Sequence, residues 1–191
     1  MEEIILATHN LGKVKELKQI LQNDKVLSLK EAGIDLEIEE DQPTFEGNAL
    51  KKARTIYQLT GKICIADDSG LCIEALDGFP GVKTARFLGE NASQKERNDY
   101  ILHKMKSLEK SERKANVVTC IAVVNGNGQE KVYTGVLSGY IADRIRGNNG
   151  FGFDEIFEIE DGRTLAQLDA EEKNIISSRR KAIEQLQKDW I

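Results

Sequence analysis

The sequence is poor in cysteine, and the few that it has follow no recognisable pattern. Cys64, Cys72 and Cys120 are three in number, and their spacing matches no zinc-binding or redox motif. Each lies in an apolar, strand-like run, where a cysteine usually packs as a small buried hydrophobe. We therefore expect no disulfide and a location in the reducing cytoplasm.

Long apolar runs and an excess of positive charge are also missing. No stretch approaches the ~20 apolar residues needed to cross a membrane, and no basic region precedes an apolar run as in a signal peptide. Lys and Arg number 27 against 32 Asp and Glu, which gives a net charge of −5. Because no positive field favours nucleic acid, we expect neither a membrane nor nucleic acid as a partner. The two histidines are too few for a metal cluster.

What the chain does have is enough apolar sequence for a core. At 40% hydrophobic over 191 residues, it suits one domain spanning 1–191, or one with two lobes. Helices and strands alternate early and a hairpin follows, which predicts an α/β protein with a mixed sheet. The predicted strands are 3–7, 63–66, 71–75, 117–124 and 131–141, and the predicted helices are 12–21, 44–59, 93–108 and 170–190. A hairpin turn is predicted at 125–128.

Two adjacent carboxylates, Asp67 and Asp68, follow the apolar run at 63–66 and precede Ser69 and Gly70. We predict that a strand ends here, because open α/β sheets build their sites at strand ends. Paired carboxylates with hydroxyl and backbone donors suit Mg²⁺ and phosphate oxygens. An ordinary turn is the alternative interpretation, since Asp, Ser and Gly all favour turns.

A strand-to-helix connection near the start carries a second polar group. Thr8 and Asn10 place hydrogen-bonding side chains at a predicted helix N-terminus, and Lys13 adds a cation in the first turn. The free backbone N–H groups and the positive dipole end at such a terminus favour a bound phosphate. Because the glycine spacing of a Walker P-loop is absent, a simple helix cap with a surface lysine is the alternative.

An acidic run that includes Glu40 precedes the helix predicted at 44–59. This run is either a solvated face that complements the helix dipole or a source of a metal ligand beside Asp68. Within the helix, Asn48 and Lys52 are one turn apart and share a face. We therefore expect these two side chains to reach the same pocket.

Late in the chain, Phe151, Gly152, Phe153 and Asp154 form a glycine- and phenylalanine-rich loop. Such a loop allows close backbone approach to a ligand, stacking of a ring on a base and reading of the base edge. A turn with core aromatics is the alternative. Lys173 lies early in the helix predicted at 170–190, where a cation opposes the helix dipole, and this placement hints at a functional use.

Taken together, these segments resemble the noncanonical purine nucleoside triphosphate pyrophosphatases, the inosine triphosphatase family. The resemblance runs nearly end to end and rests on four motifs in order. They are A-T-H-N-L-G-K at 7–13, A-D-D-S-G-L at 66–71 with L-D-G-F-P-G-V-K-T-A-R-F at 76–87, R-G-N-N-G-F-G-F-D at 146–154 and E-E-K-N-I-I-S-S-R at 171–179.

The resemblance implies a fold and an activity. The fold would be an elongated α/β structure, a mixed β-sheet flanked by helices, with two lobes and a central nucleotide-binding cleft. The activity would be hydrolysis of ITP, dITP and XTP to the monophosphate and pyrophosphate. The family uses Mg²⁺ and usually forms a homodimer, so both are expected here.

The resemblance also implies roles for individual residues. Asp68 would be the proton acceptor and a metal ligand, Glu40 the other acidic metal ligand, and Asp67 would support Asp68. Phosphate or ribose contacts are implied for Thr8, Asn10, Lys13, Lys52 and Ser69. Phe151 would stack on the base, and further substrate contacts are implied for Gly152, Phe153, Asp154, Lys173, Ser178 and Arg179.

The sequence departs from the family pattern at three positions. Gly47 stands where a Glu usually completes a capping box with Thr44, Ser178 replaces a His of the base-reading wall, and Glu155 replaces a Pro. Ser178 motivates one alternative, a pyrophosphatase for modified pyrimidine nucleotides. Gly47 and Ser178 together motivate another, a nucleotide-binding protein with weak catalysis.

Overall fold

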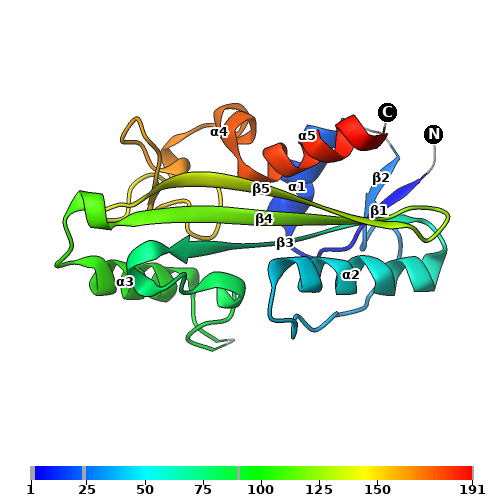
Figure 1. Cartoon of the computed structure of the whole chain (residues 1–191), viewed down its shortest axis with the longest axis horizontal. Coiled ribbons are helices and arrows are strands. Elements are labelled where there is room, and N and C mark those ends of the chain that lie inside the picture. The colour runs from blue at the N-terminus through cyan, green and yellow to red at the C-terminus, as the bar shows by residue number, and fades with distance from the viewer. Residues whose placement is uncertain (1–2, 23–24, 90, 191) are drawn as a thin grey trace. The chain divides into compact units, whose positions relative to one another are not determined.

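A computed structural model describes residues 3–22, 25–89 and 91–190 of the chain, and Figure 1 shows its helices and strands. The chain divides into two units. Unit 2 consists of Ser69–Val118 and Val136–Ser177, and unit 1 contains the rest of the described residues. The strands are β1 (Ile4–Leu6), β2 (Val26–Ser28), β3 (Ile63–Ile73), β4 (Lys114–Val124), β5 (Glu130–Ile141) and β6 (Phe157–Glu158), and the α-helices are α1 (Leu11–Leu21), α2 (Phe45–Thr60), α3 (Gln94–Met105), α4 (Ala170–Ile176) and α5 (Ser178–Trp190).

The six strands form one sheet in the order β2-β1-β3-β4-β5-β6. Strand β1 pairs in parallel with β2 and β3, whereas β5 pairs antiparallel with β6. The predicted α/β class with a mixed sheet is confirmed. Within the described residues, no helix is long and apolar enough to cross a membrane.

Unit 1 packs helices on both faces of its strands, and residue alternation along the strands decides which face receives which side chain. On one face, Ile5, Cys64 and Ala66 pack with residues of α2. On the other face, Ile63 and Ile65 pack with residues of α1 and α5. Figure 1 shows α2 on one side of these strands and α1 and α5 on the other. Residues 67 and 68 therefore face different helices.

Helix α5 begins directly against β5, and Gly135 makes this approach possible. A Cβ atom at Gly135 would lie 2.0 Å from the Ser178 carbonyl oxygen and 2.8 Å from the Ala182 nitrogen. Both are backbone atoms, so no side-chain movement could relieve the overlap. The glycine therefore fixes where the first turn of α5, which carries Ser178 and Arg179, meets the sheet.

Unit 2 has its own core. Leu71 and Ile73 of β3 pack with Ile101 and Met105 of α3 and with the buried Phe157. Several aromatic rings line this core, among them Phe79, Phe87, Tyr100 and Phe153, whose ring centroids lie between 5.1 and 6.2 Å apart in the contacting pairs.

The prediction that a strand ends at the two aspartates was wrong. Strand β3 runs without interruption from Ile63 to Ile73, so the segments predicted as two strands are one. Both carboxylates are inside the strand, and each is stabilised there by partners from helices far away in the sequence. Local turn propensity is therefore overridden by tertiary contacts.

The prediction of one closing helix at 170–190 was also wrong. Ser177 adopts an extended conformation with φ −61° and ψ 148°, and it separates α4 from α5. The unit boundary falls at this residue. Ile176 packs on the core of unit 2 and Ala182 on that of unit 1, so each helix belongs to a different unit. Consecutive serines favour such a break, because their hydroxyls compete for backbone hydrogen bonds.

The turn and the helix cap, which depend only on neighbouring residues, were predicted correctly. The turn at 125–128 closes with hydrogen bonds from the Asn125 nitrogen to the Gln129 oxygen and from the Gly128 nitrogen to the Asn125 oxygen. Ser93 caps α3 in a full capping box with Glu96. The short strands β2 and β6 were not predicted; with three and two residues, they are too short to show a period.

The core assignment of α1 predicts a contrast between two leucines on this helix. Leu17 is 0% exposed and Leu11 is 77% exposed. We expect Leu17→Ala to lower the free energy of unfolding by about 2–5 kcal/mol, whereas Leu11→Ala should change it by no more than about 0.5 kcal/mol. Urea unfolding followed by circular dichroism measures both. Equal losses in the two variants would contradict the packing of α1 described above.

Candidate active site

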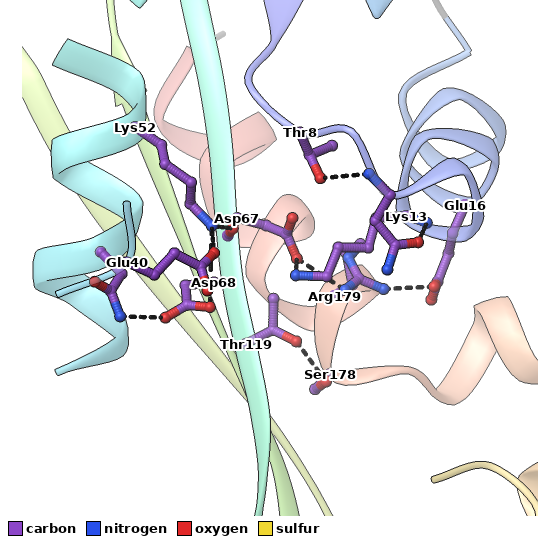
Figure 2. Close-up of polar contacts among 12 residues, drawn as sticks. Thr8, Lys13, Glu16, Glu40, Lys52, Asp67, Asp68, Thr119, Ser178 and Arg179 are labelled. Atoms are coloured by element: carbon purple, nitrogen blue, oxygen red, sulfur yellow. Dashed lines mark hydrogen bonds and ion pairs between the residues drawn. The ribbon is translucent and has the colours of Figure 1, made fainter. Parts of the chain in front are cut away.

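The candidate site in unit 1 is organised by two adjacent acids of β3 that point to opposite faces. Asp67 is two residues after Ile65, so its side chain points to the same face, towards α1 and α5. Asp68 is two residues after Ala66 and points to the other face, towards α2. Both side chains are buried. Figure 2 shows the two carboxylates directed to different sets of partners.

Asp67 is part of a buried network of charges. Its Oδ2 accepts a hydrogen bond from the Arg179 guanidinium at 2.8 Å and lies 3.1 Å from the Lys13 Nζ. Arg179 also donates to the Glu16 carboxylate at 2.5 Å. Burial alone would raise the pKa of Asp67, but Lys13, Arg179 and Lys52 outweigh it and hold the pKa well below its usual range. Asp67 is therefore a permanent anion at neutral pH.

The N-terminus of α1 brings the phosphate-binding candidates of the sequence to the same side as Asp67. Asn10 is the N-cap, and its side chain accepts from the Lys13 backbone nitrogen at 3.1 Å. Thr8 accepts from the Asn10 backbone nitrogen at 3.2 Å. These contacts fix the loop and direct Lys13 from the first turn towards Asp67. A helix N-terminus with an adjacent cation is suited to an anion.

Asp68 is held on the other face by α2. The Asn48 amide donates to its Oδ2 at 3.0 Å, and the Lys52 Nζ lies 3.9 Å from its Oδ1. The same ammonium donates to Glu40 at 2.6 Å and to the main-chain oxygen of Asp67 at 2.5 Å. Lys52 therefore connects both predicted metal ligands and the backbone between the two acids.

The electrostatic surroundings of Asp68 differ from those of Asp67. Burial raises the pKa of Asp68, and the nearby Glu40 carboxylate raises it further against the lowering effect of Lys52. A carboxyl whose pKa is raised in this way is a better proton acceptor than an ordinary aspartate. Two neighbouring acids with oppositely shifted pKa values indicate different roles.

The residues present fit a magnesium ion. Within the described part of the chain, no group of three or more His, Cys, Asp or Glu side chains could enclose a metal. Mg²⁺ does not need such an enclosure, because proteins usually hold it by one or two carboxylates together with substrate phosphates and water. Glu40 and Asp68 supply two carboxylates that the Lys52 ammonium contacts at 2.6 and 3.9 Å.

A second group of predicted residues lies in unit 2. The Asp154 carboxylate accepts from the Phe151 backbone nitrogen at 2.8 Å and from the Lys173 Nζ at 2.6 Å. The same Nζ lies 4.3 Å from the centroid of the Phe151 ring. Gly152 lies in the same turn, and Phe153 is buried with its ring stacked on that of Phe87. The structure therefore brings Phe151, Asp154 and Lys173 together, while Phe153 belongs to the core.

The remaining predicted residues lie close to the unit boundary along the chain. Ser69 follows Asp68 in β3 and is the first residue of unit 2. Ser178 belongs to unit 1, where its hydroxyl lies 2.8 Å from that of the buried Thr119. Arg179 is 5% exposed, with Glu16 and Asp67 as partners. The base-contact roles of Ser178 and Arg179 stay predictions.

Glu16 was missed by the sequence analysis. A glutamate on a helix is usually solvated, but here it is buried beneath Arg179. One signal was available, since Glu16 lies three residues after Lys13 and such pairs share a helix face. The arginine that neutralises Glu16 is 163 residues away, so no local pattern reveals it.

Comparison with known proteins shows which family the chain belongs to. The model of the Ham1 family matches residues 4–189. The chain belongs to the Ham1 family. A relative from Bacillus subtilis named dITP/XTP pyrophosphatase is 44% identical over 191 residues, covering 98% of this chain and 96% of the relative. One of the same name from Clostridium perfringens is 43% identical over 195 residues, covering 97% and 96%. The family predicted from the four motifs is confirmed.

Solved Ham1 structures share the fold. The Ham1 protein of Staphylococcus aureus has a TM-score of 0.87 and 39% sequence identity, and the match covers 99% of this chain and 98% of that one. A Ham1 protein from Coxiella burnetii gives the same TM-score and identity over 100% and 98%. These likenesses place the two acids of β3 within a Ham1 fold.

The buried network around Asp67 predicts a contrast between two adjacent arginines of α5. Arg179→Ala leaves the carboxylates of Glu16 and Asp67 without this partner and should lower the free energy of unfolding by about 3–5 kcal/mol. Arg180 pairs with Glu184 at the surface, so Arg180→Ala should lower it by about 0–1 kcal/mol. Urea denaturation at neutral pH compares the two. A similar small loss in both would show that the network does not stabilise the fold.

Proposed function

We propose that the chain is a pyrophosphatase that hydrolyses dITP, XTP and ITP to the nucleoside monophosphate and pyrophosphate. It would thereby remove noncanonical purine nucleotides from the nucleotide pool. The observation that carries the proposal is Asp68, a buried carboxylate between Asn48 and Lys52, in a chain that matches the Ham1 family along nearly its whole length. The names of the relatives give dITP and XTP as substrates of those proteins, and the family resemblance adds ITP.

The residues of unit 1 supply what anhydride hydrolysis requires. Lys13 and Lys52 provide positive charge beside Asp67 and Asp68, and positive charge offsets the negative charge that develops on the triphosphate oxygens. Asp68 accepts the proton of the attacking water, a role that its raised pKa favours. Release of pyrophosphate requires that the water attacks the α-phosphorus.

We also propose Mg²⁺ as the cofactor, with Glu40 and Asp68 as its protein ligands. When bound, the ion supplies Lewis-acid stabilisation of the phosphate oxygens. The Lys52 ammonium lies 2.6 Å from a Glu40 oxygen and 3.9 Å from an Asp68 oxygen, so this side chain holds the pair together before substrate arrives. Asn48 anchors the second oxygen of Asp68.

Further parts of the proposal rest on the family resemblance. In unit 2, Phe151 is the residue proposed to stack on the base, with Asp154 and Lys173 holding its loop through the contacts described above. A homodimeric assembly and a cytoplasmic location are proposed on the same basis.

The proposal predicts a defined substrate profile and its loss in one variant. The wild type should release pyrophosphate from ITP, dITP and XTP, and far less from ATP. Asp68→Asn should reduce kcat by about 10²–10⁴-fold, the typical contribution of a positioned general base. Asp189→Asn, at an exposed surface pair with Lys131, is the control and should keep wild-type turnover.

The same assay separates the alternatives. Preferential turnover of a modified pyrimidine triphosphate would replace the purine proposal. Binding of ITP without pyrophosphate release would support a nucleotide-binding protein, and full activity of Asp68→Asn would remove Asp68 from the chemistry.

The metal proposal predicts different effects for two adjacent glutamates. Glu40→Gln replaces a charged oxygen ligand by a neutral one and should raise the Mg²⁺ concentration for half-maximal activity by about tenfold or more, since even outer partners of metal ligands contribute about 10–100-fold. Glu39 is exposed, and Glu39→Gln should leave the magnesium titration unchanged. Activity that persists in excess EDTA would refute a metal requirement, and coincident titrations of both variants would exclude Glu40 as a ligand.

A further inference from the structure

Asn48 is a fully buried asparagine whose side chain uses both ends of its amide. It is 0% exposed and lies in the first turn of α2. Its Nδ2 donates to the Asp68 carboxylate at 3.0 Å, and its Oδ1 accepts from the Gln42 backbone nitrogen at 2.9 Å. One amide group therefore joins three segments that are separate in the sequence: the loop before α2, the helix itself and strand β3.

The loop that Asn48 holds is the loop that carries Glu40. Gln42 lies two residues after Glu40, and its backbone is fixed against the start of α2. Gly47 permits this contact, because a Cβ atom there would lie 2.9 Å from the Gln42 Cβ and 3.2 Å from the Thr44 Oγ1. The absence of a side chain at position 47 therefore lets the loop lie close enough for the hydrogen bond to Asn48.

We propose that Asn48 is a positioning residue that sets the placement of the Glu40 loop relative to the Asp68 carboxylate. The inference rests on the function proposed above, for which these two acids are the metal ligands and Asp68 is the proton acceptor. Only an amide meets both requirements at this size, since it presents a donor to the carboxylate and an acceptor to the backbone N–H. An ionised aspartate keeps the acceptor, loses the donor and adds a negative charge beside Asp68, and alanine loses both the donor and the acceptor.

Asn98 offers a matched control in unit 2. It is also 0% exposed, and its amide has the same arrangement: Nδ2 donates to the Glu155 carboxylate at 3.0 Å, and Oδ1 accepts from the Gln94 side chain at 2.9 Å. Changes at Asn98 therefore report the general effect of removing a buried amide between a carboxylate and a donor.

The test compares Asn48→Ala, Asn48→Asp, Asn98→Ala and Asn98→Asp. Both Asn48 variants should lower kcat by about 10–100-fold, the range seen when outer partners of metal ligands are removed, with little change in KM for ITP. Asn48→Ala should also raise the Mg²⁺ concentration needed to increase the melting temperature of the nucleotide-free protein. The Asn98 variants should lower the melting temperature but keep kcat close to that of wild type.

Hydrogen exchange at the Gln42 backbone amide distinguishes the acceptor role of Asn48 from its donor role towards Asp68. Its protection should persist in Asn48→Asp and be lost in Asn48→Ala, because only the first keeps an acceptor for this N–H. If Asn48→Asp keeps wild-type kcat, or if the Asn98 variants lose as much kcat as those of Asn48, the proposal is overturned. Failure of the proposed function would instead appear in the wild type as no pyrophosphate release from any nucleotide, and the magnesium and exchange measurements would then decide the role of Asn48 alone.

Discussion

Two adjacent carboxylates in the interior of one strand are the constraint on which the architecture of unit 1 depends. Alternation along β3 sends Asp67 and Asp68 to opposite faces of the sheet, so neither face can be covered by an apolar helix surface alone. A buried charge without partners is strongly destabilising. Each covering helix therefore contributes polar groups at the same level of the strand: Lys13 from α1 and Arg179 from α5 on one face, Asn48 and Lys52 from α2 on the other.

This division also gives the two acids different electrostatic surroundings. Cations around Asp67 lower its pKa, while burial, together with the Glu40 carboxylate, raises the pKa of Asp68. The main-chain oxygen of Asp67 accepts from Lys52, so the cation of one face is also fixed by the backbone of the acid that faces the other way. Lys52 therefore acts on both acids, because its charge lowers the pKa of Asp67 and its ammonium contacts Asp68.

The sequence predicted those parts of the fold whose signals are local. The cap of α3 depends on Ser93 and Glu96, and the turn at 125–128 depends on Asn125 and Gly128. Both are contacts within a few residues, and both features were predicted correctly. The continuity of β3 and the break at Ser177 were not predicted, because both depend on contacts between residues that are distant in the sequence. Asp67 is held in β3 by Arg179, and Ile176 and Ala182 pack in the cores of different units. For the site, Lys13, Lys52, Glu40 and both acids were predicted and come together in unit 1. Glu16 was missed because its burial depends on one distant arginine.

The position of α5 in the chain has a consequence for synthesis on the ribosome. Residues 8–16, 40–52 and 67–68 leave the ribosome before Arg179, which lies 112 residues after Asp67 in the chain. Until then Asp67 has Lys13 but not its second cation, and Glu16 has no arginine to neutralise it. A nascent chain can form the strands and first helices of unit 1 in order, yet its charge network closes only after α5 has left the ribosome.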